Sequence, residues 1–394
     1  MRGSLTPDRS PSSIMRILQI TEASSAGVGR HVVDLSKGLL ELGCEVHLIY
    51  SPRRIDATFA AGIEGLPGLH LRPLDMRRGA HISDLLVVHQ VRSYLRDQGP
   101  FDVIHGQSSK GGAIGRLAGL RHPSAMVYTP HCIFTMNPTI GKLQFHLFRA
   151  IESGLARCTD AVIAVSPDEQ QHLLEIGFDR QRVRCIPNGL GSQTWADRLS
   201  LRRSLGVTEQ DVVVGFLGRL CHQKNPLLMI AAFAELAPRC PNAVLVMVGQ
   251  GELEEGARSL AEQHRLGKRV LWLGYWKPEE ILPAFDLFAL TSRYEALSYV
   301  LLEALAAGLP IVSTRVGGAR LAIEPDINGS LVPSFEPRDF AAALEGIVAS
   351  RDKRQHMAQA SYRKAEDFLV SIMVERTYDL YTHLSLNSVL QPLR

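Results

Sequence analysis

Short apolar runs alternate with longer amphipathic stretches along both halves of this chain. The runs have the length of buried β-strands, and the stretches between them have the length and period of helices. Because strands that alternate with helices form parallel sheets joined by right-handed crossovers, the pattern predicts an α/β fold with two doubly wound parallel sheets. The expected strands are 14–20, 45–50, 103–104, 126–128 and 161–165 in the first half, and 212–217, 243–248, 270–273, 287–290, 311–313 and 329–332 in the second.

The length of the chain supports a division into two domains. It has 394 residues, which is more than a single hydrophobic core usually spans. After Pro187-Asn188-Gly189, residues 190–203 are polar and lack strand character, which indicates a hinge between the halves. Residues 1–13 are polar and lack the apolar stretch of a secretory signal, so we expect a disordered leader.

Cysteine usage and hydrophobicity favour a cytoplasmic protein. The six cysteines are scattered without a Cys-x-x-Cys pair, which is typical of reduced thiols rather than of a disulfide framework or a zinc site. No run reaches the roughly 18 apolar residues of a membrane-spanning helix. Aromatic and basic residues do not interleave as a base-stacking platform requires, so nucleic-acid binding is not expected.

Positive charge is concentrated in the first half, although the net charge is only +3. Residues 1–190 hold 21 lysines and arginines against 17 acids, and the remaining residues hold 22 against 23. Residues 141–157 have the pattern of a basic amphipathic helix, which would allow a peripheral contact with anionic lipid on the inner face of a membrane. The alternative is a core helix with solvated basic residues. The arginines expected on loops and helix ends of this half are Arg53, Arg54, Arg72, Arg77, Arg78, Arg116 and Arg121.

Two glutamates with seven residues between them, Glu295 and Glu303, carry the strongest chemical signal. The apolar run 285–290 leads into a loop, and we expect Ser298 to offer its side-chain oxygen to the first amides of a helix that ends at Gly308. Glu295 then lies on the loop and Glu303 within the helix. The amides at the start of this helix would attract an anion such as phosphate. A carboxylate on each side of an anion site indicates a ligand with hydroxyls at both ends.

A second cluster upstream supplies the opposite charge. The expected strand 212–217 is followed by Gly218, Arg219 and Lys224 on the turn into the next helix. A guanidinium and an ammonium group at the carboxyl end of a parallel strand are suited to clamp a diphosphate.

Together, Gly218-Arg219-Leu220, Lys224, Glu295 and Glu303 resemble the nucleotide-sugar site of retaining family 4 glycosyltransferases. This resemblance implies the GT-B architecture, in which two Rossmann-like domains face a central cleft. It implies an N-terminal acceptor domain over 14–190, a C-terminal nucleotide-sugar domain over 205–375, and a C-terminal helix over 376–394 that crosses back to the first domain. Further motifs follow in the family's order at residues 26–29, 165–166, 186–189, 248–249, 317–318 and 328–329.

The resemblance also implies roles for single residues. Glu303 would accept hydrogen bonds from the ribose hydroxyls, Glu295 would hold a hydroxyl of the transferred sugar, and Arg219 and Lys224 would bind the diphosphate. Leu297 and Ser298 would act through their backbone amides. Four further positions keep an ordinary structural alternative. Gly27 and Gly29 would face the donor phosphates or form a plain tight turn. His131 would contact the sugar or the leaving group or be a satisfied loop histidine, and His105 is a weaker candidate of the same kind.

The resulting prediction is a retaining, metal-independent transferase without a cofactor. It would move a hexose from a nucleoside diphosphate sugar, UDP rather than GDP, to a glycan or lipid-linked acceptor in cell-surface or exopolysaccharide synthesis. The sequence contains no Asp-x-Asp motif, and protein cations would take the place of a metal. A nucleotide-sugar epimerase or hydrolase of the same fold and a non-catalytic sugar-binding protein are the alternatives.

One departure from the family pattern follows Gly317-Gly318. The family commonly has a Pro-Glu pair there, whereas this chain has Ala319-Arg320-Leu321. Arg320 could add a cation for the phosphate or for an acidic sugar.

Overall fold

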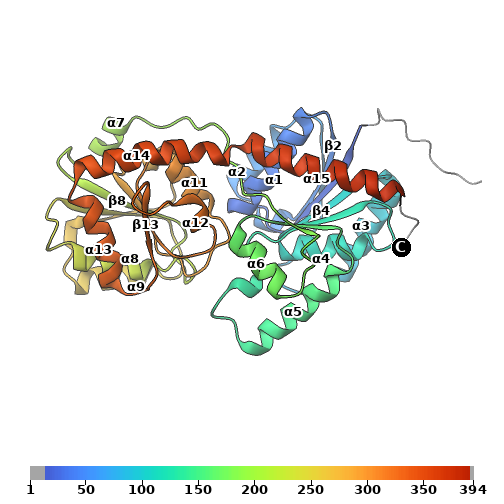
Figure 1. Cartoon of the computed structure of the whole chain (residues 1–394), viewed down its shortest axis with the longest axis horizontal. Coiled ribbons are helices and arrows are strands. Elements are labelled where there is room, and N and C mark those ends of the chain that lie inside the picture. Colours follow the sequence, from blue (N-terminus) through green and yellow to red (C-terminus); the bar gives the residue numbers. More distant parts are fainter. Residues whose placement is uncertain (1–13, 391–394) are drawn as a thin grey trace, which may run out of the picture. The chain divides into compact units, whose positions relative to one another are not determined.

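The computed structural model describes residues 14–390, and the expected leader lies outside them. The described chain forms two parallel sheets, each flanked by helices (Figure 1). The fold class expected from the alternating pattern is therefore confirmed. Both sheets are built by crossovers through helices, as parallel strands require.

The first sheet has seven strands in the order β3-β2-β1-β4-β5-β6-β7. Its strands are β1 (Arg16–Thr21), β2 (Glu45–Tyr50), β3 (Leu69–Pro73), β4 (Val103–Gln107), β5 (Ala125–Thr129), β6 (Ala161–Ala164) and β7 (Val183–Cys185). The helices along this part of the chain are α1 (Ala26–Glu41), η1 (Pro52–Arg54), α2 (Ala57–Glu64), α3 (Asp84–Gln98), α4 (Ser108–Ala118), η2 (Phe134–Met136), α5 (Lys142–Ala156) and α6 (Pro167–Glu175).

The second sheet has six strands in the order β10-β9-β8-β11-β12-β13. Its strands are β8 (Val212–Leu217), β9 (Ala243–Val248), β10 (Val270–Leu273), β11 (Leu287–Leu290), β12 (Ile311–Thr314) and β13 (Gly329–Val332). The helices are α7 (Arg198–Ser204), α8 (Pro226–Leu236), α9 (Glu254–Gln263), η3 (Gly267–Arg269), α10 (Pro278–Ile281), η4 (Leu282–Ala284), α11 (Tyr299–Ala306), α12 (Ala319–Ala322), α13 (Pro337–Val348), α14 (Arg351–Ala365), η5 (Glu366–Phe368) and α15 (Val370–Leu390).

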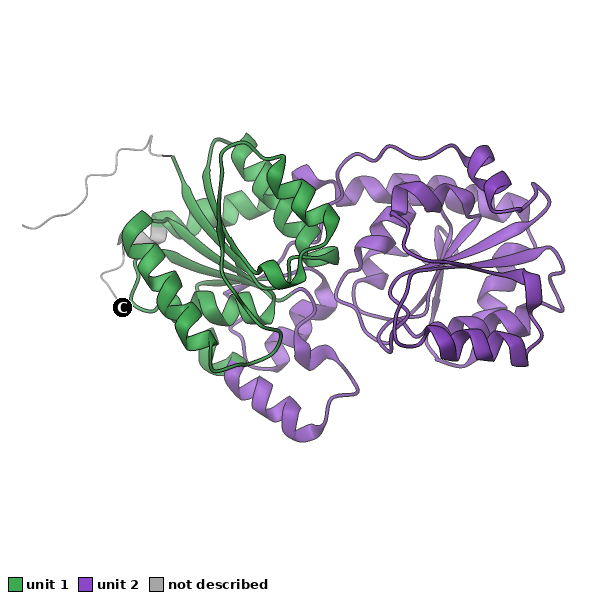
Figure 2. Cartoon of the chain, turned by 180° about the vertical axis from the view of Figure 1, so that it is seen from behind, with its two compact units in different colours: residues 1–130, 152–163, 374–394 green, residues 131–151, 164–373 purple. Residues whose placement is uncertain are grey.

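Two compact units divide the described chain, and their boundaries do not follow simple sequence halves (Figure 2). The smaller unit contains residues 14–130, 152–163 and 374–390, and the larger one contains residues 131–151 and 164–373. The C-terminal part of α15 thus belongs to the same unit as β1 to β5. Within that unit, Tyr381 Oη lies 2.5 Å from Nδ1 of the buried His105.

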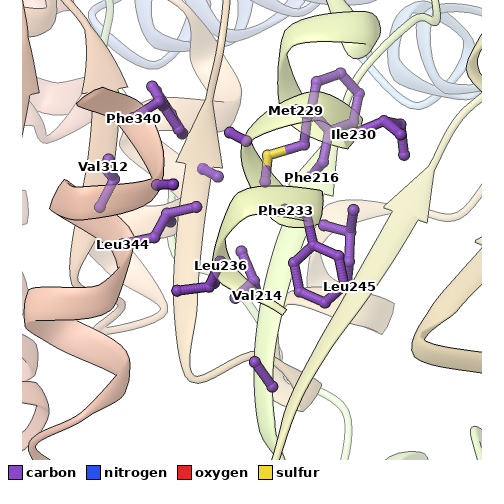
Figure 3. Packing of buried hydrophobic residues seen from close by; sticks show 14 of the residues in the cluster. Val214, Phe216, Met229, Ile230, Phe233, Leu236, Leu245, Val312, Phe340 and Leu344 are labelled. Carbon is purple, nitrogen blue, oxygen red and sulfur yellow. The ribbon is translucent and has the colours of Figure 1, made fainter. Parts of the chain in front are cut away.

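The core of the second sheet explains why its strands read as continuous apolar runs. Val214 on β8 lies beside Leu245 on β9 and Leu287 on β11 in register. Helices α8 and α13 cover one face, where Phe233 and Phe340 are fully buried (Figure 3). A strand covered on both faces has no polar side to alternate with, which is the expected pattern for parallel sheets.

Glycine is required at one position within β8. A Cβ at Gly215 would collide with the ring of Phe285, which packs directly on the strand. Phe285 is itself fully buried just ahead of β11. The missing side chain therefore allows the close approach of the segment that leads into the candidate site.

Part of the segment 190–203 is helical, since α7 begins at Arg198, and the buried Arg202 donates to Asp286 Oδ2 at 2.9 Å. The hinge expected there stays a prediction. Two other expectations need correction. Arg116 was expected at the surface, but its side chain is fully buried, where it pairs with Glu152 Oε2 at 2.9 Å. The reading of residues 141–157 as a core helix is also wrong, since Glu152 is the one buried residue of α5.

Candidate active site

The candidate site lies at the carboxyl ends of β8 and β11, which are neighbours in the six-stranded sheet. The chain proceeds from β8 to β9 on one side and from β11 to β12 on the other, so the loops at their carboxyl ends diverge. Open parallel sheets bind ligands at such a switch point. The loop after β8 carries Gly218, Arg219 and Lys224, and the loop after β11 carries Glu295, Leu297 and Ser298.

Lys224 joins the two loops. Its Nζ lies 2.6 Å from Glu295 Oε1 and 3.3 Å from Ser298 Oγ. Ser292 Oγ donates a 2.9 Å hydrogen bond to the same glutamate oxygen. The methylene groups of Lys224 pack beside Gly218, since its Cδ would lie 3.5 Å from a Cβ at that position. The structure therefore brings an ammonium group, a carboxylate and the start of a helix into one cluster.

Ser298 is the N-cap residue of α11, as expected, but its side chain does not cap the helix. The expectation of a side-chain cap is wrong because Ser298 Oγ accepts a hydrogen bond from the Lys224 ammonium group instead. A bond from a charged donor is stronger than one from a neutral amide. Ser298 thus links the cation to the positive end of the helix.

Arg219 is exposed and follows Gly218 directly at the end of β8. Its charge acts on Tyr294, the residue before Glu295. Burial raises the pKa of Tyr294, and Arg219 opposes that rise. The charge of Arg219 therefore reaches the loop that carries Glu295.

Glu303 and Leu297 are both buried. Glu303 lies in α11, five residues after Ser298 and so about 7.5 Å farther along the helix axis. Its side chain is enclosed by the apolar segment around it, with 4% exposed. The backbone oxygen of Leu297 accepts a 3.0 Å hydrogen bond from Asn188 Nδ2, which fixes the loop ahead of α11.

His131 lies on a strained loop between β5 and η2. His131 and Cys132 both have left-handed backbone conformations, with φ values of 55° and 76°, and non-glycine residues adopt this region at a cost. The fully buried Glu169 holds the loop: its Oε1 accepts from the amides of Cys132 at 2.7 Å and Ile133 at 3.1 Å, and its Oε2 accepts from Val165 at 2.9 Å. Burial raises the pKa of Glu169, and the three amides oppose that rise.

This loop also approaches the Glu295 loop. The pKa of the partly buried Cys132 thiol is well above its ordinary value, first because of desolvation and then because Glu169 and Glu295 lie nearby. The Ala296 backbone hydrogen-bonds the same thiol. Sequence reasoning missed Glu169, although Ser166-x-x-Glu169 is the pattern of a helix capping box and Ser166 Oγ does accept from the Glu169 amide at 3.2 Å.

Arg320 has a carboxylate partner. It forms an ion pair with Asp168, whose other oxygen accepts a 3.3 Å hydrogen bond from the Gly318 amide. Asp168 thus offsets the charge of Arg320, and the hypothesis of an additional cation for a phosphate or acidic sugar stays a prediction. The pairing joins positions 152 residues apart, and no local pattern signals it.

Three candidates lie elsewhere. Gly27 and Gly29 belong to the smaller unit, in the first turn of α1, where a Cβ on Gly29 would lie 3.1 Å from the Ser24 backbone. His105 is fully buried in that unit, with Nε2 at 2.7 Å from Thr129 Oγ1. Burial holds the pKa of His105 well below its ordinary value. Its environment is that of a satisfied core histidine.

Among residues 14–390, one group has the spacing of metal ligands: Glu45, His47 and His70 on β2 and β3. Glu45 Oε1 already pairs with Arg16 Nη2 at 2.7 Å, and His47 Nδ1 lies 2.8 Å from Tyr94 Oη. The hydrogen bond from Arg16, followed by that from His47, lowers the pKa of Glu45 to about 2. The group therefore forms its own polar network, and a neighbouring guanidinium disfavours a cation.

Comparisons with known proteins show the family of the chain. Residues 25–192 match the model described as Glycosyltransferase Family 4, and residues 197–364 match Glycosyl transferases group 1. The D-inositol 3-phosphate glycosyltransferase of Corynebacterium jeikeium is 30% identical over 319 residues, covering 75% of each protein. The chain belongs to glycosyltransferase family 4. The family and enzyme class expected from the motifs are thereby confirmed.

This family 4 glycosyltransferase is also similar in sequence to a galactosyltransferase and in fold to a solved structure. The UDP-Gal:alpha-D-GlcNAc-diphosphoundecaprenol alpha-1,3-galactosyltransferase of Escherichia coli is 28% identical over 300 residues, covering 73% of this chain and 76% of that protein. The structure of Anabaena Alr3699/HepE in complex with UDP and glucose superposes with a TM-score of 0.81 at 22% identity, covering 94% of this chain and all of the other. The GT-B fold is therefore confirmed.

Proposed function

We propose that this glycosyltransferase moves a hexose, with retention of configuration and without a metal, from a UDP-sugar to a glycan or lipid-linked acceptor. The observation that carries the proposal is the cluster of Lys224, Glu295 and Ser298 at the switch point between β8 and β11. It combines a cation, the positive end of a helix and a carboxylate. These groups match a diphosphate joined to a polyol.

The proposed chemistry follows from the charge that develops during transfer. The bond between the anomeric carbon and the diphosphate oxygen breaks, a bond forms to an acceptor hydroxyl oxygen, and the hydroxyl proton leaves with the diphosphate. Arg219, Lys224 and the first amides of α11 would stabilise the growing negative charge more than the ground state. Glu295 would then orient the sugar and Glu303 the ribose. Retention rests on the resemblance to retaining family members.

Two relatives support the choice of donor. The Escherichia coli relative is named for UDP-Gal, and the Anabaena protein was solved with UDP and glucose. Metal independence is proposed because protein cations lie at the switch point and the sequence lacks an Asp-x-Asp motif. His131 would lie at the sugar end, since its loop contacts the Glu295 loop through Cys132.

A donor panel tests this proposal. We expect UDP-glucose or UDP-galactose to raise the melting temperature by mass action, with the same shift in magnesium and in EDTA, and GDP-mannose to raise it less. NMR of the transferred product should show the anomeric configuration of the donor. Full turnover of the donor to free sugar or an epimer in the absence of acceptor would instead favour the hydrolase or epimerase alternative.

We also propose a peripheral membrane contact through α5. Its apolar residues Leu143, Leu147 and Ile151 are 84%, 55% and 44% exposed, and their spacing of four places them on one face of the helix. Lys142 and Arg149 are exposed on the same helix, whose acid, Glu152, is buried against Arg116. This combination suits anionic lipid. Separately, no helix among residues 14–390 is both long and apolar enough to cross a membrane.

Vesicle flotation tests the contact. We expect binding to vesicles containing phosphatidylglycerol and much weaker binding to pure phosphatidylcholine, with a loss at high salt. The double change Leu143→Ser and Leu147→Ser should reduce partitioning at least tenfold, because each buried leucine contributes about 1.5 to 3 kcal/mol. Leu199→Ser, at a comparably exposed leucine of α7, is the control. Unchanged partitioning of the double variant would contradict the assignment to α5.

A further inference from the structure

A pocket of about 620 Å³ opens in the larger unit beside the candidate site. Its volume lies within the range of small-ligand sites. Residues of η2, α6 and α12 line it. Six of the nine lining residues have polar side chains, and Met136, Pro167 and Leu321 add apolar surface. The polar ones are Thr135, Asp168, Gln171, His172, Glu175 and Arg320.

The turn at Gly317-Gly318 separates this pocket from the Glu295 loop. A Cβ at Gly317 would collide with the backbone oxygen of Glu295 and would lie 3.4 Å from Asp168 Cβ, which lines the pocket. A Cβ at Gly318 would collide with the backbone oxygen of Ala296. The absence of two side chains thus brings the pocket within one turn of backbone of the residues proposed to hold the donor sugar.

The pocket carries more negative than positive charge. Asp168 and Glu175 are its carboxylates, and its guanidinium group, on Arg320, is already paired with Asp168. His172 hydrogen-bonds Thr135 Oγ1 at 2.8 Å, and burial lowers its pKa, so the ring is neutral at neutral pH. The lining therefore offers hydrogen-bond acceptors and amide or imidazole groups without an uncompensated cation.

We propose that this pocket binds the acceptor and selects an uncharged, polyhydroxylated ring over a phosphorylated one. The inference rests on the proposed function, because it needs the donor sugar at the Glu295 loop. Sugar hydroxyls can donate to Asp168 and Glu175 and accept from the Gln171 amide, whose Nε2 lies 3.0 Å from Glu175 Oε1. A phosphate dianion can only accept, and it would meet the Glu175 carboxylate, which no cation of the lining offsets. In this respect the chain differs from what the name of the D-inositol 3-phosphate glycosyltransferases implies for their acceptor.

Matched acceptor pairs test the selection. Release of UDP from UDP-glucose and UDP-galactose would be measured with the octyl glycosides of glucose, galactose and N-acetylglucosamine and with the 6-phosphate of each, at equal concentrations. We expect at least a tenfold preference for the neutral member of any pair that is used. Equal or better use of the phosphates overturns the proposal, and so does failure of every neutral glycoside while UDP still binds by calorimetry. Absence of UDP binding would overturn the proposed function itself.

Two variants with the same change in charge assign the selection to the pocket. Glu175→Gln should weaken use of the neutral acceptor about tenfold in KM and reduce the discrimination against the phosphate, with UDP affinity within twofold. Gln170 lies on the same helix outside the pocket lining, and Gln170→Lys changes the net charge by the same +1 that Glu175→Gln does. It should leave both acceptor parameters unchanged. Equal effects of the two variants would show a general charge effect and overturn the pocket assignment.

Discussion

Replacing Lys224 by alanine is expected to reduce kcat/KM for the donor between about tenfold and a hundredfold. A charge-assisted hydrogen bond contributes about 1.5 to 3 kcal/mol, which corresponds to this range. Part of the loss should appear in kcat, because the charge on the departing diphosphate is greatest in the transition state. The change also leaves the carboxylate of Glu295 without its 2.6 Å partner at a site that is 8% exposed.

The measurements are initial rates over a range of donor concentrations and the dissociation constant of UDP. Lys224→Arg keeps the charge but not the fit against Gly218, so it should recover part of the activity. Lys268→Ala removes an exposed cation from the same unit and is the control. An unchanged UDP affinity in Lys224→Ala would contradict diphosphate binding by this residue.

The strands of the second sheet could be predicted closely because their environment is uniform. Central parallel strands are buried on both faces, so β8, β9 and β11 appear in the sequence as apolar runs. Two strands of the first sheet were missed. β3 is an edge strand that is mostly exposed and ends at Pro73, and β7 has three residues. Neither strand buries enough apolar surface to give a recognisable hydrophobic pattern in the sequence.

The candidate site was predictable only as far as its signals are local. Glu295 on a loop and Glu303 on a helix follow from the helix start at Ser298 and the apolar residues around them. The partner of Ser298 Oγ did not follow, because Lys224 lies 74 positions away. Asp168 was missed for the same reason, since its partners Gly318 and Arg320 lie on a distant loop. Glu169 has a local signal in Ser166-x-x-Glu169, but its bonds to Cys132 and Ile133 do not follow from that pattern. The role of such a side chain depends on which residue it contacts in the folded protein. Secondary-structure propensity does not predict that contact.

The second large effect is expected on stability rather than on activity. Glu152→Ala should destabilise the smaller unit by about 3 to 5 kcal/mol, because it leaves a buried guanidinium group without its counter-charge. Arg116 is fully buried, donates from Nε to the Gly112 oxygen at 2.9 Å, and lies 4.0 Å from the centre of the Tyr128 ring. Tyr128 Oη donates to the other Glu152 oxygen at 3.3 Å. Removing the acid therefore breaks a hydrogen-bonded network among buried side chains.

Amide hydrogen exchange of α4 and β5 is the suitable measurement, since the three tryptophans lie in the larger unit and do not report on this one. Glu345→Ala, which breaks the exposed pair with Arg239, should cost at most about 1 kcal/mol. Replacing both buried partners, as in Arg116→Met with Glu152→Leu, should restore much of the loss, because apolar side chains remove the uncompensated charge. If Glu152→Ala alone left exchange in α4 and β5 unchanged, the pair would not stabilise this unit, and helix α5, which carries Glu152, would be held in place by other contacts.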